Sequence, residues 1–332
     1  MRTGRRSRRC RHQAGWCGPA LLTVLLCICD APRDNPLDPW LGGNIDGRVM
    51  TRRADGIPYA LVLIPGADRV TRTDSAGGFS FRGLPEQTLW IYLSADGYAP
   101  DSQLVQTDKG RIDSLTSYLN GLPYFTHCSI SAHVYGRGWP PEPLLYCRLA
   151  AQVTDRDGDA DIDSVWASIP DIGFTKRLIF DPDSGRYYYT LWASAIPSQR
   201  LETLVGLPVR ITAADERDTV SRAPSPGITR IIYDLPQPLF PFGGLDTLST
   251  DTTLIWQRFD HGYSVRYHGE VVRIEAGSPA GIVAAFDTPG PADTSYRIQA
   301  QALVTGDYYW TIEAVDIFGN SSRSAEELFH AR

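Results

Sequence analysis

The sequence predicts an all-β protein in which three strand-rich segments follow one another along the chain. Tyr (16), Trp (8) and Pro (24) are frequent and Met (2) is rare, a composition that favours strands and turns. Short stretches of alternating apolar and polar residues, separated by turn residues, recur from Gly43 onward. No segment shows a sustained helical period of apolar residues, so a helical core is not expected. A chain of 332 residues has room for two or three domains.

Residues 1–29 are predicted to be a signal segment. Six arginines precede the first acidic residue, and an apolar stretch from Trp16 to Cys29 follows them. That stretch is shorter than the ~20 residues that a membrane-spanning helix needs. The order basic, apolar, polar is typical of a secretory signal, so we expect an exported protein. Residues 30–42 are rich in proline and are predicted to form a short extended tether.

The end of the apolar stretch, Leu26-Cys27-Ile28-Cys29, resembles a bacterial lipoprotein signal, with a leucine three residues before Cys29. The resemblance implies that lipid is attached to Cys29, or alternatively to Cys27. A thioether-linked diacylglycerol and an amide-linked acyl chain would hold the protein on a membrane, on the periplasmic or cell-surface side, since one chain alone binds only marginally. Ile28 departs from the small residue that usually precedes the modified cysteine. Plain secretion and a retained anchor helix therefore stay open as alternatives.

The first strand-rich segment covers residues 43–122. Short alternating stretches such as Phe79-Ser80-Phe81 lie between glycine-containing turns. The motifs Gly47-x-Val49, Gly78-x-Ser80-Phe81 and Gly83-Leu84-Pro85 resemble those of the carboxypeptidase regulatory-like domain. This resemblance implies a small prealbumin-like β-sandwich, an accessory module without a peptidase centre of its own.

Two further strand-rich segments follow, residues 123–236 and 237–332. The first of them resembles an immunoglobulin-like sandwich of the extracellular repeat type. The second resembles a fibronectin type III domain, with Trp256 as its early buried tryptophan and Trp310-x-Ile312-x-Ala314 as its late core strand. The expected fold class is therefore all-β, with three tandem β-sandwich domains after a signal segment and a short tether.

Two cysteines, Cys128 and Cys147, follow the signal segment. An even pair in an exported protein is a candidate disulfide, and closing a loop of about 20 residues would stabilise the fold by roughly 3 kcal/mol. The alternative is two separate small buried residues. A metal site with His127 and His133 is not expected, because the paired spacing of metal-binding cysteines is absent.

The most distinctive chemical pattern is the acidic stretch Asp155-Arg156-Asp157-Gly158-Asp159-Ala160-Asp161. Alternating carboxylates suit a hard cation such as calcium, which takes six to eight oxygen ligands. The candidate ligands are Asp155, Asp157, Asp159 and Asp161, and calcium is the one cofactor considered. The stretch departs from the EF-hand, because Gly158 is the fourth rather than the sixth residue. A tight turn in which aspartate side chains cap backbone amides is the alternative.

No catalytic motif is found, and we expect a non-enzymatic protein. The net charge is −6 and the body has no basic stripe, so no nucleic-acid partner is expected. The favoured function is a membrane-anchored adhesion, spacer or assembly module with a protein or glycan ligand. The alternatives are a carbohydrate-binding module and an accessory subunit of an outer-membrane or secretion complex. Candidate exposed aromatic residues for a ligand are Trp139, Tyr187, Tyr188, Tyr189, Trp192, Tyr308 and Tyr309.

Overall fold

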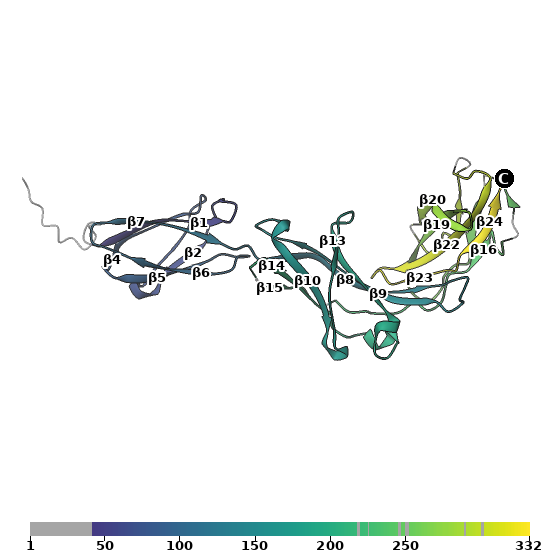
Figure 1. Ribbon diagram of the computed structural model, residues 1–332, viewed down its shortest axis with the longest axis horizontal. Coiled ribbons are helices and arrows are strands. Elements are labelled where there is room, and N and C mark those ends of the chain that lie inside the picture. The colour runs from purple at the N-terminus through teal and green to yellow at the C-terminus, as the bar shows by residue number, and fades with distance from the viewer. Residues whose placement is uncertain are drawn as a thin grey trace, which may run out of the picture.

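The fold is seen in a computed structural model, which describes residues 42–332 except 218–219, 225, 245–246, 250–251, 289 and 300–301. The signal segment and the candidate lipidation residues Cys27 and Cys29 lie outside the described residues. The described chain consists of strands with a few short helical turns, which confirms the all-β prediction. None of those turns has the length and apolar character of a membrane-spanning helix. Three bodies follow one another along the long axis in Figure 1.

The first module, residues 42–122, is a sandwich of two small sheets. Along β5, Leu89, Ile91 and Leu93 point into the core, while Trp90 and Tyr92 point outward, as the strand period requires. Its strands, in the sheet orders β4-β1-β7 and β3-β2-β5-β6, are β1 (Gly43–Thr51), β2 (Leu61–Ile64), β3 (Arg69–Arg72), β4 (Gly78–Leu84), β5 (Thr88–Ser94), β6 (Asp101–Gln106) and β7 (Ile112–Leu119), with the helical turn η2 (Pro65–Ala67) after β2.

The second module begins at Pro123, and its core includes Leu149, Val165 and Ile211. One sheet has the order β11-β10-β14-β15, and the other contains β12-β13-β9-β8. The strands are β8 (Tyr124–Tyr135), β9 (Leu144–Thr154), β10 (Ile162–Ile169), β11 (Phe174–Arg177), β12 (Ile179–Asp181), β13 (Arg186–Trp192), β14 (Arg210–Asp215) and β15 (Val220–Arg222). Between them lie the helical turns η3 (Asp159–Asp161), η4 (Pro170–Ile172), η5 (Ala193–Ala195) and η6 (Leu201–Leu204).

The third module has a core around Trp256, Tyr267 and Trp310, all of which are buried. Ile231 packs against the second core and Ile232 belongs to the third, so the cores meet upstream of the expected boundary at Gln237. The strands are β16 (Pro238–Phe240), β17 (Thr247–Leu248), β18 (Thr253–Trp256), β19 (Val265–Glu275), β20 (Ser278–Asp287), β21 (Ser295–Arg297), β22 (Gly306–Asp316), β23 (Ser321–Arg323) and β24 (Glu327–Ala331).

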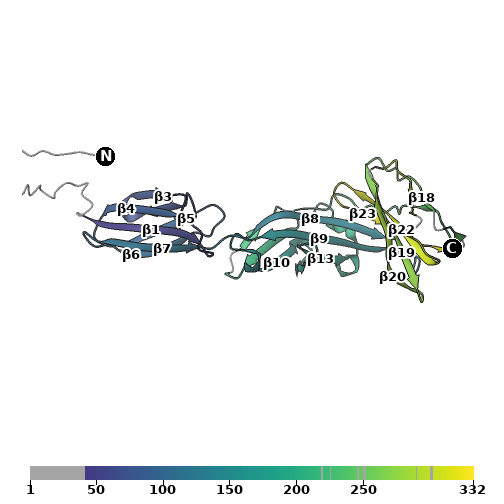
Figure 2. The same ribbon diagram turned by 90° about the horizontal axis from the view of Figure 1, so that it is seen from above.

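The second and third modules share one continuous sheet, which was not expected from the sequence. Strand β23 of the third module pairs in parallel with β8 of the second, with Ser321 opposite His133. The sheet then runs β9-β8-β23-β22-β19, and β8 can be followed toward the third module in Figure 2. This pairing covers an edge of β8 that would otherwise present unpaired backbone groups. We call this contact the seam.

Candidate cation site at the first junction

The acidic loop connects β9 to β10 at the end of the second module that faces the first. The Asp155 carboxylate accepts a hydrogen bond from the N–H of Asp157 at 2.7 Å, and the N–H of Gly158 donates to the carbonyl of Asp155. These bonds form the tight aspartate turn that the sequence suggested. Gly158 has a φ of 111°, a backbone conformation that residues with a side chain rarely adopt. The loop conformation therefore depends on glycine at this position.

Three of the four candidate aspartates converge. Carboxylate oxygens of Asp155, Asp157 and Asp161 all lie within 4.8 Å of one another. Asp159 lies outside this group, and its carboxylate instead accepts a hydrogen bond from the N–H of Asp155 at 3.2 Å. The strict alternation fails because the chain enters the helical turn η3 at Asp159, where successive side chains no longer point to opposite sides. We call Asp155, Asp157 and Asp161 the aspartate cluster; a bound metal remains a prediction.

The first module contacts the aspartate cluster directly. The Asp157 carboxylate accepts hydrogen bonds from two of its backbone N–H groups, that of Gly121 at 2.6 Å and that of Arg52 at 3.3 Å. The Arg52 guanidinium forms an ion pair with Asp161 at 2.8 Å. Arg53 donates to the backbone carbonyl of Asp157 rather than to a carboxylate. The cluster therefore joins two modules rather than belonging to one loop alone.

A fourth carboxylate, Asp215 at the end of β14, lies behind the aspartate cluster. Asp215 is buried and accepts hydrogen bonds from the side chain of Asn120 and from the N–H of Arg217. Asn120 belongs to the first module and adjoins Gly121, so a second carboxylate contact crosses the same junction. Sequence reasoning singled out neither Asn120 nor Arg52, because contacts between distant segments leave no local pattern.

Burial makes the cluster electrostatically unusual. Asp155 is only 4% exposed, and the pKa of its carboxyl group is raised to about 6 in total, with burial as the largest cause. The hydrogen bond from the N–H of Asp157 lowers this pKa in part, and the charges of the neighbouring aspartates raise it further. The site therefore holds closely spaced negative charges in a place where water screens them poorly. A bound cation would relieve this repulsion.

The predicted disulfide is wrong for this structure. Both Cys128 and Cys147 are free thiols. They lie on the adjacent strands β8 and β9, but Cys128 pairs with Ala151 and Cys147 with Ala132. The offset is four residues, or about 13 Å along the strands, whereas bridged Cα atoms lie about 4.4–6.8 Å apart. Both cysteines pack against the second core, and burial raises the pKa of Cys147 to about 12.

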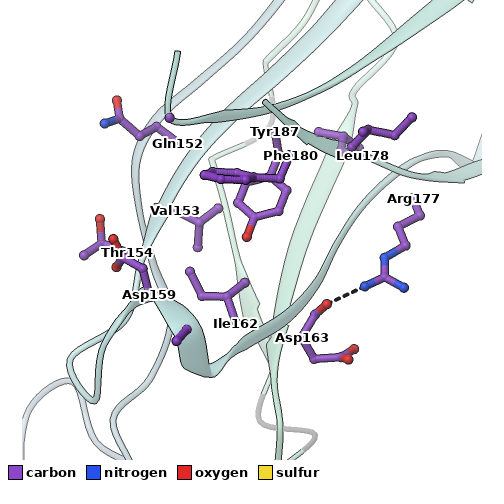
Figure 3. A pocket seen from close by; sticks show the side chains of 13 residues that line it. Gln152, Val153, Thr154, Asp159, Ile162, Asp163, Arg177, Leu178, Phe180 and Tyr187 are labelled. Carbon is purple, nitrogen blue, oxygen red and sulfur yellow. Dashed lines mark hydrogen bonds between the residues drawn. The ribbon is translucent and has the colours of Figure 1, made fainter. Parts of the chain in front are cut away.

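A groove of about 840 Å³ lies beside the acidic loop in the second module (Figure 3). The rings of Phe180 and Tyr187 form one wall, with centroids 4.9 Å apart, and Arg177 donates a hydrogen bond to the backbone carbonyl of Asp163. Asp159 at the rim already accepts from the N–H of Asp155. The lining of the groove is thus mainly apolar, with one cationic side chain, Arg177, and the carboxylates of Asp159 and Asp163, and its described residues present no assembled acid–base pair.

The candidate aromatic residues from the sequence differ in their exposure to solvent. Trp139 is strongly exposed, but Tyr308 is fully buried and donates its hydroxyl to the carbonyl of Val304. The sequence analysis did not select Trp90 and Tyr92, which are half-exposed on the outer face of β5. Strict alternation with buried leucines and isoleucine along that strand is a signal that could have identified them.

The first module is similar to a known domain family. Residues 44–120 match the family model of the carboxypeptidase regulatory-like domain. The match covers the module that sequence motifs had assigned to that family. No match was found among the curated proteins.

Several solved structures resemble the chain at low identity. The major pilin subunit BcpA of Bacillus cereus has a TM-score of 0.30 and 9% identity, covering 84% of this chain and 91% of its own. The FN1–FN3 domains of chicken CNTN1 have a TM-score of 0.30 and 11% identity, covering 84% and 92%. The fibronectin(III)-like modules of Clostridium thermocellum CbhA have a TM-score of 0.27 and 12% identity, covering 63% and 93%.

Proposed function

We propose that the protein is a non-enzymatic, exported lipoprotein, held on a membrane by lipid on Cys29 or Cys27, that acts as a spacer, adhesion or assembly module. The observation that carries the proposal is the end-to-end order of three β-sandwich modules along one axis (Figure 1). Specific contacts join each pair of neighbouring modules: the aspartate cluster joins the first to the second, and the seam joins the second to the third. Such a chain can hold its third module away from a surface.

The order of the segments supports the anchor. A basic and apolar segment ending in two cysteines precedes the proline-rich tether, and the first module begins directly after it. A tether of this length separates a folded module from a membrane without adding a stable fold of its own. Export also suits the acidic body, which offers no basic stripe for nucleic acid.

Mass spectrometry of the mature N-terminus, from membrane and soluble fractions of bacterial cells, tests the anchor. We expect a lipid-modified Cys29 in the membrane fraction, and a Cys29→Ser variant that moves to the soluble fraction. The Cys27→Ser variant is the matched control and should stay in the membrane fraction. If only Cys27→Ser releases the protein, the acceptor is Cys27. An unmodified N-terminus beyond Asp30 in the soluble fraction would overturn the anchor.

A carbohydrate-binding function is the second candidate, favoured by one patch of the first module. Trp90 and Tyr92 are 50% and 46% exposed, and their ring centroids lie 6.4 Å apart. Leu104, opposite Trp90 on β6, and Leu63, opposite Tyr92 on β2, extend the patch. Exposed aromatic rings are suited to stacking on the apolar faces of sugars.

Affinity electrophoresis of the full chain in gels containing soluble polysaccharides tests this second function. If the patch binds glycan, at least one polysaccharide should retard the wild type, and Trp90→Ala should lose most of the retardation. Tyr118→Ala, at an exposed aromatic position on the opposite sheet, is the matched control and should bind normally. Equal retardation of wild type and Trp90→Ala would rule out the patch as the binding surface.

A further inference from the structure

The aspartate cluster carries more negative charge than its neighbours balance. Arg52 pairs with one oxygen of Asp161, while Arg53 contacts a backbone carbonyl. Arg156 lies over the rings of Tyr98 and Tyr124 rather than beside a carboxylate. Among the described residues, the three aspartates of the cluster are thus offset by one direct cationic contact, that of Arg52 with Asp161.

Two carboxylate oxygens of the cluster are buried without a hydrogen-bond donor. Asp155 Oδ2 and Asp161 Oδ2 accept no hydrogen bond from any described residue. The Asp155 residue is 4% exposed, and the Asp161 side chain is 10% exposed. A buried charged oxygen without a partner is costly, so these atoms call for a ligand that a solvated acidic surface would not need.

The spacing of the oxygens fits one hard cation. Oxygens that share a calcium ion each lie at about 2.3–2.6 Å from it, so two of them are at most about 5 Å apart. The three aspartate oxygens lie within 4.8 Å of one another. The cluster contains carboxylates and no histidine or cysteine, which disfavours zinc. Magnesium keeps most of its waters and suits a buried three-carboxylate corner less well.

We propose that Asp155, Asp157 and Asp161 bind one calcium ion, and that this ion fixes the first module on the second. Asp157 connects ion binding to docking, because it belongs to the cluster and its carboxylate accepts a hydrogen bond from the N–H of Gly121 in the first module. Arg52 pairs with Oδ1 of Asp161 and leaves Oδ2 open to the ion, but its positive charge opposes binding. Its side chain is 31% exposed, so the guanidinium has a path to solvent. The proposal is independent of the lipid anchor.

Coupling between the ion and the junction follows from linkage. Suppose that calcium binds more tightly when the two modules are docked. Calcium then stabilises the docked arrangement, and the gain in docking free energy equals the gain in calcium-binding free energy. The amide of Gly121 reports the docked state, because its hydrogen bond exists only when the two modules touch. Calcium should therefore slow hydrogen exchange at Gly121.

The test uses the purified full chain in mild detergent after chelator treatment. Isothermal titration with calcium chloride should show one site, and magnesium chloride should bind more weakly. Asp155→Asn should weaken calcium binding by roughly tenfold or more, because one charged ligand is lost. Asp159→Asn is the matched control, since it keeps an acceptor oxygen for the N–H of Asp155 and should bind as wild type. Arg52→Gln should strengthen binding, because it removes the competing cation.

Three results would overturn the proposal. The first is a titration without heat, and without a calcium-dependent rise in melting temperature, up to millimolar calcium. The second is equal affinity in the wild type and Asp155→Asn, or an equal loss in Asp159→Asn. The third concerns the junction alone: calcium binding that leaves exchange at Gly121 unchanged would place the ion on the loop without any role in docking. Asp161→Asn provides a second ligand variant if Asp155→Asn does not fold.

Discussion

The Asn320→Ala variant is expected to lose about 3 kcal/mol of unfolding free energy, the largest effect of a single side chain at the seam. Asn320 is fully buried, and its side-chain oxygen accepts the N–H of Ala132 on β8 at 3.0 Å. Its side-chain amide donates to the buried Asp316 carboxylate, also at 3.0 Å. Alanine would leave the Ala132 donor without a partner and remove one donor from a buried charge, each of which costs about 1–3 kcal/mol.

Urea unfolding of the full chain, followed by intrinsic tryptophan fluorescence, measures this loss. The matched control is Thr229→Ala. Thr229 is exposed, and its hydroxyl lies 3.5 Å from the same Asn320 amide. That variant should change the unfolding free energy by less than about 0.5 kcal/mol. An Asn320→Ala protein with the wild-type urea midpoint would show that this side chain does not hold the two modules together.

Local patterns predicted much of the fold. Period-two alternation and turn residues identified strands such as β5 and β13, and the family motifs of residues 44–120 agree with a matching family model. The seam escaped prediction, because β8 and β23 are far apart in sequence and β23 is only three residues long. A strand of three residues is too short for a period to appear, and its pairing with β8 depends on the packing of two modules.

The sequence predicted the acidic loop of the candidate site but not its contacts with the first module. The acidic loop is a local pattern, and it identified Asp155, Asp157 and Asp161 together with Asp159. The helical turn η3 decides which of these four aspartates converge. The contacts of the cluster with Gly121 and Arg52 come from the first module, which no local pattern around Asp155 could reveal. The disulfide prediction failed on register: the count of cysteines suggested a bridge, but the β8–β9 pairing keeps the thiols apart.

Acid is expected to weaken the seam through His133. The imidazole is stacked on Tyr146 with centroids 4.8 Å apart, and its Nδ1 lies 2.7 Å from the hydroxyl of Ser321 on β23. Its Nε2 lies 2.8 Å from the hydroxyl of Ser131. Burial, together with the positive charge of Arg148, lowers the pKa of His133 to about 4. The folded protein therefore keeps this imidazole neutral at a pH where the unfolded chain protonates it.

The sign of the effect follows from this difference. The unfolded chain binds a proton near pH 6.5 and the folded chain only near pH 4, so His133 costs no stability above pH 6.5. As the pH falls from 6.5 to 4, the unfolding free energy should decrease by up to about 3 kcal/mol from this group. Urea unfolding at a series of pH values measures it. Titrating carboxylates contribute over part of the same range, so the informative quantity is the difference between wild type and His133→Gln.

His133→Gln keeps hydrogen-bonding groups for both serines but cannot titrate, so its stability should fall less between pH 6.5 and pH 4. The difference between the two pH profiles should grow steadily toward pH 4. His127→Gln, at an exposed position of the same strand, is the matched control and should follow the wild-type profile. Parallel profiles for the wild type and His133→Gln would show that the imidazole is not held neutral at the seam. Hydrogen exchange of β23 locates the effect, because the strand that bonds His133 should open first in acid.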